Sequence, residues 1–113
     1  MKEQLKKHVD KYGTIRWKLS NGLCHREDGP AVIYADSTKA WYYQGKQHRV
    51  DGPAVILPDG IKIWCYHGKH HRIDGPATIF PNGSPEYWFM GEHVHEGDFE
   101  YTLIRRKEAQ REN

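Results

Sequence analysis

The central part of the chain alternates short apolar stretches with connections that contain glycine and proline, a pattern of β-strands rather than of helices. Residues 61–66, Ile-Lys-Ile-Trp-Cys-Tyr, predict one strand, and residues 77–80, Ala-Thr-Ile-Phe, predict a second. Pro-Asp-Gly at residues 58–60 and Pro-Asn-Gly at residues 81–83 favour tight turns. The pattern therefore predicts antiparallel hairpins that follow one another along the chain.

The same pattern recurs at a fixed interval. The stretch Gly-Lys-Gln-His-Arg-Val-Asp-Gly-Pro-Ala-Val-Ile at residues 45–56 returns almost unchanged at residues 68–79, and a looser copy occupies residues 22–33. The histidines of the copies, His25, His48 and His71, are 23 residues apart. A fourth unit begins at Tyr87 but has Val94 where a histidine is expected, as is common in the terminal units of repeat arrays. We expect a stack of similar units.

A chain of 113 residues has the size of one domain. We expect an all-β fold, an antiparallel meander of seven strands that forms an elongated single sheet from three and a half repeats over residues 13–95. The spacing of Leu5 and Val9 is compatible with a short helix over residues 2–11, within an N-terminal cap of residues 1–12. Residues 96–113 predict a C-terminal helix that starts near Asp98 and ends in a basic tail.

Strand alternation places aromatic and apolar residues in rows on one face of the sheet. Either these rows are core, covered by a terminal helix or by curvature of the sheet, or they are an exposed platform for a base, a sugar or a partner protein. The residues concerned are Trp17, Trp41, Trp64 and Tyr87, followed two positions later by Leu19, Tyr43, Tyr66 and Phe89.

The repeated motif His-Arg-x-Asp-Gly-Pro-Ala also has two interpretations. A His and an Asp three residues apart are elements of a general base with its orienting carboxylate, or of a metal site. A catalytic site needs one asymmetric arrangement, however, whereas this pair occurs three times. We therefore favour a structural role, in which Asp accepts backbone N–H groups in a turn before Gly-Pro, and Arg pairs with Asp or lies over a Trp ring.

Composition narrows the classes of function. A net charge of +2 is too small for a dedicated duplex-DNA-binding protein, so nucleic acid is not an expected partner. Cys24 and Cys65 predict neither a disulfide nor a Cys-x-x-Cys site, and the histidines near residues 67–71 lack carboxylates at metal-site spacing, so we expect no metal and no cofactor. No signal-peptide core and no membrane-spanning stretch is evident, which predicts a cytoplasmic protein without a membrane partner.

The spacing Trp-x-x-x-Gly-x-x-His-Arg-x-Asp-Gly-Pro-Ala, followed by Pro-Asp-Gly or Pro-Asn-Gly, resembles the short repeats of small proteins from tailed bacteriophages and some bacteria. The resemblance covers residues 13–95. The period of 23 residues is also similar to that of MORN repeats, whose hairpins stack into an elongated curved sheet, although the usual MORN pattern lacks His-Arg-x-Asp-Gly-Pro-Ala. The phage-like resemblance implies an accessory protein that disarms a host system by binding to it in the host cytoplasm.

These arguments together predict a non-enzymatic protein-binding module that inhibits a host defence or regulatory protein by occlusion. Two other functions stay open: a sponge for a nucleotide signal, and a metal-dependent nuclease built on the His and Asp pairs. Free sheet edges also predict a homodimer formed by sheet extension. The expected partner-binding residues lie in the central units and are Tyr43, Tyr66, Arg49, Arg72, His48 and His71.

Overall fold

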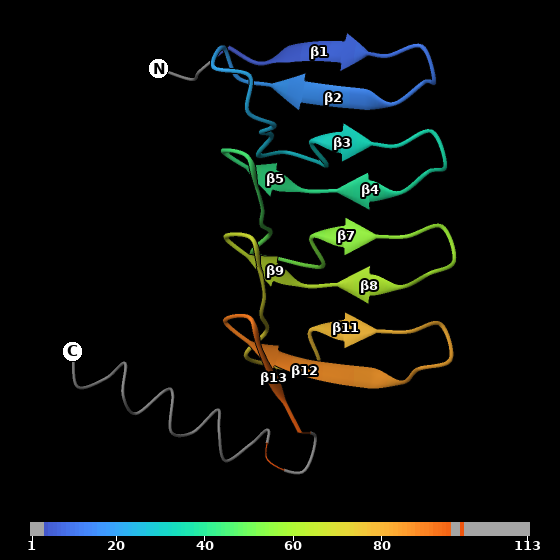
Figure 1. The fold of residues 1–113 in the computed structure, drawn as a ribbon, viewed down its shortest axis with the longest axis vertical. Helices are drawn as coiled ribbons and strands as arrows, with labels where there is room; N and C mark the ends of the chain where they lie inside the picture. The colour runs from blue at the N-terminus through green and yellow to red at the C-terminus, as the bar shows by residue number, and fades with distance from the viewer. Residues whose placement is uncertain (1–3, 96–97, 99–113) are drawn as a thin grey trace, which may run out of the picture.

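The computed structural model describes residues 4–95 and residue 98, and this part of the chain is all-β (Figure 1). Nine strands form one antiparallel sheet in the order β1-β2-β3-β4-β7-β8-β11-β12-β13. Neighbouring strands in this sheet are also successive along the chain, except that the chain leaves the sheet to form one hairpin between β4 and β7 and another between β8 and β11. The strands are β1 (Lys6–Val9), β2 (Ile15–Lys18), β3 (Val32–Ile33), β4 (Lys39–Ala40), β7 (Val55–Ile56), β8 (Lys62–Ile63), β11 (Thr78–Ile79), β12 (Pro85–Phe89) and β13 (Glu92–Val94).

The two hairpins form a second column beside the main sheet, at the left in Figure 1. One pairs β5 (Tyr42–Tyr43) with β6 (Lys46–Gln47), and the other pairs β9 (Cys65–Tyr66) with β10 (Lys69–His70). A single tryptophan separates each hairpin from the preceding strand of the main sheet. At this residue the chain passes from one sheet to the other, while the Trp64 amide still donates to the Ala77 carbonyl at 2.7 Å.

The predicted all-β class and the antiparallel order are confirmed, but the strand count is not. The described residues form 13 short strands in place of seven. The strand predicted over residues 61–66 is divided at Trp64 into β8 and β9, and its equivalent is divided at Trp41 into β4 and β5. The remaining additional strands are β1, β6, β10 and β13. In the described part of residues 2–11, from residue 4 onward, there is no helix: residues 6–9 form β1, an exposed strand whose neighbour in the sheet is β2. The helix predicted over residues 96–113 lies outside the described residues, apart from Asp98.

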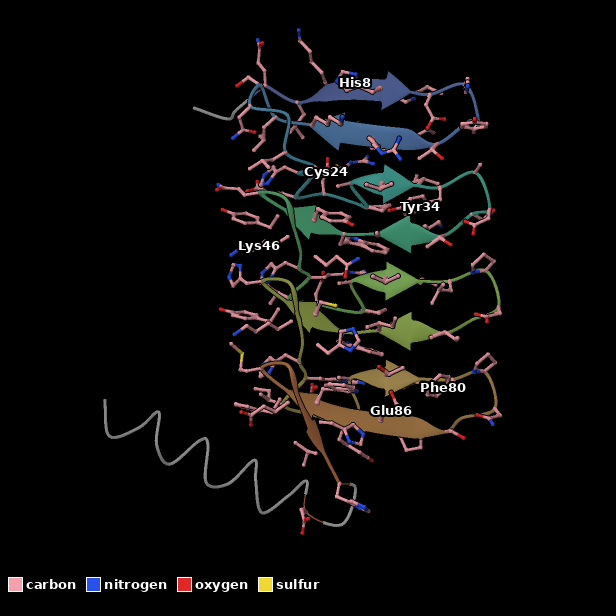
Figure 2. The ribbon with its side chains drawn as sticks, in the orientation of Figure 1. His8, Cys24, Tyr34, Lys46, Phe80 and Glu86 are labelled. Atoms are coloured by element: carbon pink, nitrogen blue, oxygen red, sulfur yellow. The ribbon has the colours of Figure 1, made fainter. Side chains whose placement is uncertain are left out.

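The core is built from small side chains of the strands. Val32, Ala40, Val55, Ile63 and Thr78 follow one another across the sheet in register, and all but the half-buried Ile63 are buried. The alanine that ends each Gly-Pro-Ala triplet is completely buried. Because the units repeat along the sheet, similar side chains recur from unit to unit along the molecule (Figure 2).

Aspartate and asparagine side chains close the tips of the hairpins in the main sheet. Asp36, Asp59 and Asn82 each accept a hydrogen bond, 2.9–3.0 Å long, from the backbone amide two residues later. These are the short polar side chains that favour such turns. The turns predicted at residues 58–60 and 81–83 are therefore confirmed, and the side chains of Asp59 and Asn82 hold them through these hydrogen bonds.

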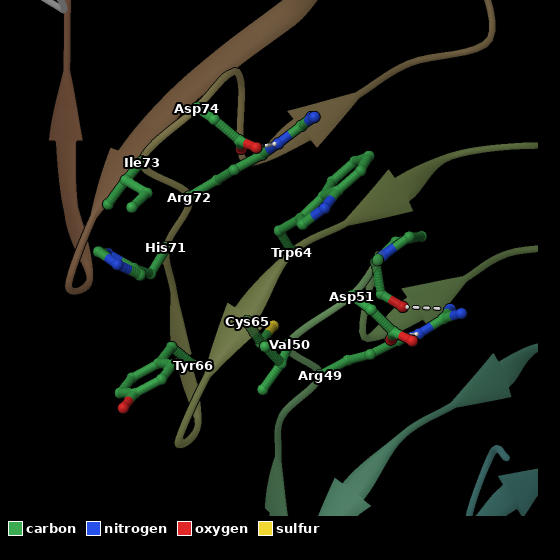
Figure 3. Close-up of a pocket in the computed structure, with 12 residues that line it drawn as sticks. Arg49, Val50, Asp51, Trp64, Cys65, Tyr66, His71, Arg72, Ile73 and Asp74 are labelled. Atoms are coloured by element: carbon green, nitrogen blue, oxygen red, sulfur yellow. Dashed lines mark hydrogen bonds and ion pairs between the residues drawn. The ribbon is translucent and has the colours of Figure 1, made fainter. Parts of the chain in front are cut away.

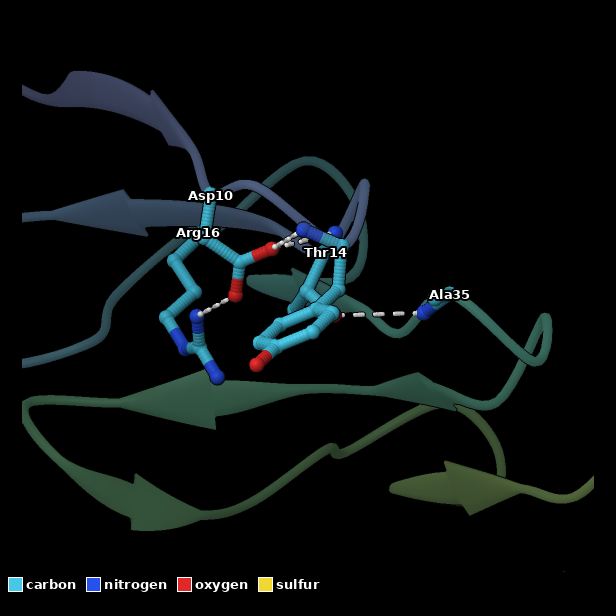
Figure 4. A network of polar contacts seen from close by, with 5 residues as sticks. Asp10, Thr14, Arg16 and Ala35 are labelled. Atoms are coloured by element: carbon cyan, nitrogen blue, oxygen red, sulfur yellow. Dashed lines mark hydrogen bonds and ion pairs between the residues drawn. The ribbon is translucent and has the colours of Figure 1, made fainter.

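The first hairpin is tied to the next unit by a polar network (Figure 4). The Asp10 carboxylate accepts the amides of Tyr12 and Thr14 and pairs with the Arg16 guanidinium at 3.1 Å. The hydroxyl of the buried Thr14 in turn accepts the Ala35 amide at 3.2 Å. This hairpin therefore has a contact of its own with the next unit, through Thr14 and Ala35.

Candidate functional site

The arginine of each motif is held by three groups at once. The Arg49 guanidinium carbon lies 4.0 Å from the centre of the Trp41 ring, its Nε donates to Asp51 at 3.1 Å, and its Nη1 donates to the Pro53 carbonyl at 3.0 Å. Arginine suits this position because it is a planar cation that stacks on aromatic rings and donates in fixed directions. The other units repeat the arrangement with Arg26 on Trp17 and Arg72 on Trp64.

The motif glycine makes room for this arginine. A Cβ atom on Gly52 would lie 2.9 Å from the guanidinium carbon of Arg49, and the corresponding distances at Gly29 and Gly75 are 3.1 and 3.0 Å. A Cβ atom at these positions would therefore force the guanidinium group to shift. Glycine allows this close approach.

The motif histidine joins one unit to the next. The Nδ1 atoms of His25, His48 and His71 each accept a backbone N–H from a residue 19 positions later, at 2.9, 3.0 and 2.9 Å respectively. Each donor directly follows a strand, β5, β9 or β12, and has a positive φ of 46–48°, and the next residue is a glycine with positive φ. Two positive φ values in succession are typical of a tight hairpin turn. The donors are Gln44, His67 and Met90.

These bonds require an unprotonated Nδ1 atom. Burial lowers the pKa of His48 below its usual range, and the neighbouring His67 lowers it further. Burial also lowers the pKa of His71. Both shifts favour the neutral imidazole, which is the form that accepts the amide.

The histidines and the second row of predicted aromatic residues form a continuous column. In the order His25, Tyr43, His48, Tyr66, His71 and Phe89, successive ring centroids are 4.7–6.0 Å apart. Tyr43 and Tyr66 stand between two histidines and remain exposed at the surface. Leu19 and Phe89 are buried at the two ends of the row, whereas Trp17, Trp41 and Trp64 are half-buried beneath their arginines.

Two equivalent grooves lie where successive units meet. The first, of about 700 Å³, includes Tyr43, His48 and Arg49 in its lining. The second, of about 620 Å³ and shown in Figure 3, includes Arg49, Tyr66, His71 and Arg72. All six residues predicted as partner contacts therefore line these grooves, and Arg49 lines both.

The role of one motif residue differs from its prediction. Asp28, Asp51 and Asp74 were expected to accept backbone amides before Gly-Pro, but each accepts a bond from its arginine. The turn role falls to the aspartate and asparagine residues of the main-sheet hairpins. The sequence-based prediction also missed Val50 and Ile73, which follow the arginine in the motif and are exposed in the groove lining. The available signal for these contacts was that Val50 and Ile73, two β-branched residues, stand in a loop whose neighbouring residues are polar.

Within residues 4–95 and 98, no group of three or more His, Cys, Asp or Glu side chains is placed to hold a metal ion. The same part of the chain has no helix with the length and apolar character needed to cross a membrane. Comparisons with models of protein families, with curated proteins and with solved structures found no match to this chain.

Proposed function

We propose that the protein is a non-enzymatic binding module that recognises another protein through the two junction grooves. The observation that carries this proposal is that a similar exposed surface occurs at two successive junctions, with a tyrosine, one β-branched residue and two aspartates in corresponding places, while Glu27 of the first groove stands where Val50 stands in the second. Tyrosine and arginine are typical of the residues that contribute most to protein interfaces. A repeated surface suits a partner that is itself extended.

The contacts within the motif favour binding over the two alternative functions. Each guanidinium is already bonded to a carboxylate and covered by a tryptophan, so it is poorly placed to contact a phosphate. The rings of Tyr43 and Tyr66 have histidines on either side, with centroids 4.7–6.0 Å away, so a base that stacked on them would have to compete with these contacts. A nuclease would need the histidines for a metal or a proton, whereas their Nδ1 atoms accept backbone amides.

From the resemblance to phage proteins we also propose that the partner is a host defence or regulatory protein, and that binding inhibits it by occlusion. The supporting structural feature is the size of the repeated face, which extends over the central units. Homodimerisation through the sheet edges β1 and β13 is a separate proposal, tested by light scattering at high concentration. The exposed Lys6 and Lys7 on β1 oppose it, because lysines on an edge strand discourage pairing with another strand.

Site-specific photo-crosslinking tests the binding proposal. A photoreactive residue at Tyr66 should capture a defined protein in the native host, whereas one at the exposed Lys62, outside both groove linings, should not. Mass spectrometry of the captured band identifies the partner. Equal capture at the two positions, or none at Tyr66, would refute recognition through the grooves.

A further inference from the structure

We infer that the grooves bind a polyproline II segment that carries a basic side chain at every third residue. This inference rests on the proposed function and names the chemistry of the partner. It follows from three properties of the grooves: their spacing, the exposed charge at their rims, and their apolar walls.

The spacing follows from the sheet. Each unit adds two strands to the sheet, β3 and β4, then β7 and β8, then β11 and β12, so equivalent points in successive units are about 9.6 Å apart. A polyproline II helix advances about 9.3 Å in one turn of three residues, which brings every third side chain to the same side. A β-strand presents alternate residues, about 6.6 Å apart, and does not match. A polyproline II segment that runs along the stack would therefore place one turn at each groove.

The exposed charge at the grooves is negative, although their linings contain arginines. The side chains of Arg49 and Arg72 are only 25% and 23% exposed, whereas those of their partners Asp51 and Asp74 are 85% and 80% exposed. The first groove also contains Glu27 and Asp28. An approaching partner therefore meets carboxylates first, at intervals of one unit. This arrangement complements a row of lysine or arginine side chains, and it would repel an acidic segment.

The walls between these carboxylates are apolar and aromatic. Val50 is 85% exposed and Ile73 is 46% exposed, and both line the second groove together with Trp64 and Tyr66. Exposed apolar side chains of this size in a concave surface are typical of a binding site. Aromatic-lined grooves receive proline-rich segments in other recognition domains, because a polyproline II helix is already ordered and loses little entropy on binding.

Synthetic peptides of about 12 residues, long enough for four turns of polyproline II, test the inference. Isothermal titration calorimetry at low and at moderate salt should show the tightest binding for repeats of Pro-Pro-Arg. Repeats of Pro-Pro-Pro-Arg, lengthened to about 16 residues so that they also carry four arginines, keep the helix and the charge but move the arginines out of step with the grooves. Gly-Gly-Arg keeps the spacing but removes the helix preference, and Pro-Pro-Glu reverses the charge. Each should bind at least about tenfold more weakly than Pro-Pro-Arg.

Variants of the protein locate the binding site. Replacing Asp51→Asn and Asp74→Asn together removes two exposed charges but keeps an oxygen for each arginine, and should weaken Pro-Pro-Arg binding about three- to tenfold. Asp36→Asn with Asp59→Asn is the matched control, because these turn residues lie outside both groove linings, and it should leave the affinity unchanged. Unfolding curves confirm that each variant is folded.

The inference is overturned if no peptide binds, if Pro-Pro-Pro-Arg or Gly-Gly-Arg binds as well as Pro-Pro-Arg, or if Pro-Pro-Glu binds best. It is overturned equally if the control variant weakens binding as much as the groove variant does. These outcomes are separable from failure of the proposed function. A partner captured at Tyr66 while every peptide fails contradicts only the polyproline inference, whereas loss of both capture and peptide binding contradicts both.

Discussion

His25 offers the sharpest test of the joint between units. It is the most buried of the three motif histidines, at 8% exposed, and its Nδ1 atom accepts the Gln44 amide at 2.9 Å in a part-buried position. We expect His25→Ala to destabilise the protein, because the substitution removes both this acceptor and a ring that packs against Tyr43, with centroids 4.7 Å apart. The free energy of unfolding, from urea curves followed by tryptophan fluorescence, measures the loss.

The size of the effect can be worked out from these contacts. An amide left without a partner in a part-buried place costs about 1–3 kcal/mol. Loss of the ring adds about 1–2 kcal/mol, at the low end of the values for large-to-small substitutions because the side chain is polar. His25→Ala should therefore lower the free energy of unfolding by about 3 kcal/mol, which corresponds to a fall in Tm of about 10–20 °C for a domain of this size.

Two further variants separate the hydrogen bond from the packing of the ring. In His25→Asn the side-chain oxygen stands where Nδ1 stood, so this variant should be about 1–2 kcal/mol more stable than His25→Ala. In His25→Gln the oxygen is one bond farther from the backbone and should recover little of that difference. If Asn and Gln stabilise the protein equally relative to Ala, the bond from His25 to the Gln44 amide does not hold the units together and the reasoning is wrong.

Three other predictions follow from the same geometry. Burial lowers the folded-state pKa of His48 and His71, so the stability that they contribute is present above their unfolded pKa of about 6.5 and is lost as the pH falls through the folded value. The urea midpoint of the wild type should therefore decline between about pH 8 and pH 5, and this decline should flatten when both histidines are replaced by asparagine. Parallel curves for the two proteins would contradict this. Gly52→Ala should lower the free energy of unfolding by about 1–2 kcal/mol, because it displaces Arg49 from the Trp41 ring and the Asp51 carboxylate. In a double-mutant cycle this cost should disappear in an Arg49→Ala background, and an unchanged cost would mean that the guanidinium is not the group displaced. Burial raises the pKa of Cys65 to about 11, so in a Cys24→Ala background a thiol reagent at pH 8 should modify Cys65 only after unfolding, and rapid reaction of this folded variant would refute the burial of Cys65.

The repeat made much of the fold accessible from the sequence. Its period of 23 residues, the alternation of β-branched residues and the Pro-Asp-Gly and Pro-Asn-Gly turns were sufficient to predict an antiparallel, all-β stack. The same repetition argued for a structural role of His-Arg-x-Asp-Gly-Pro-Ala. Arginine over tryptophan was also among the predicted arrangements, because a tryptophan precedes the arginine by eight or nine residues in each of the three complete units.

The division of each long strand was beyond the sequence-based argument. Residues 61–66 are an uninterrupted run of residues that favour strands, without glycine or proline, so the local pattern gives no sign that the chain changes sheets at Trp64. The N-terminal segment was ambiguous for a similar reason: two apolar residues four apart fit a helix, but pairing with β2 determines the outcome. Long-range pairing decides both cases, and local pattern does not encode it.

The candidate site shows the same limit. The six predicted contact residues were chosen for their side-chain chemistry, and the structure places all of them in the lining of the two grooves. Which of these residues hold the units together and which face solvent could not be predicted from the sequence. The arginines and histidines are engaged in holding the units, while Asp51, Asp74, Val50 and Ile73 are the more exposed side chains. Which of two neighbouring polar groups faces solvent depends on the path of the loop.

The central claim is that the histidine of each motif joins one unit to the next through Nδ1. Nuclear magnetic resonance tests it directly, because a hydrogen bond from an amide to a ring nitrogen transmits a scalar coupling between the two nitrogen nuclei. At neutral pH, uniformly labelled protein should show this coupling between the Nδ1 atoms of His25, His48 and His71 and the amides 19 residues later, and it should vanish when the rings are protonated. Three Nδ1 atoms that carry protons at neutral pH, with no coupling to those amides, would contradict the account.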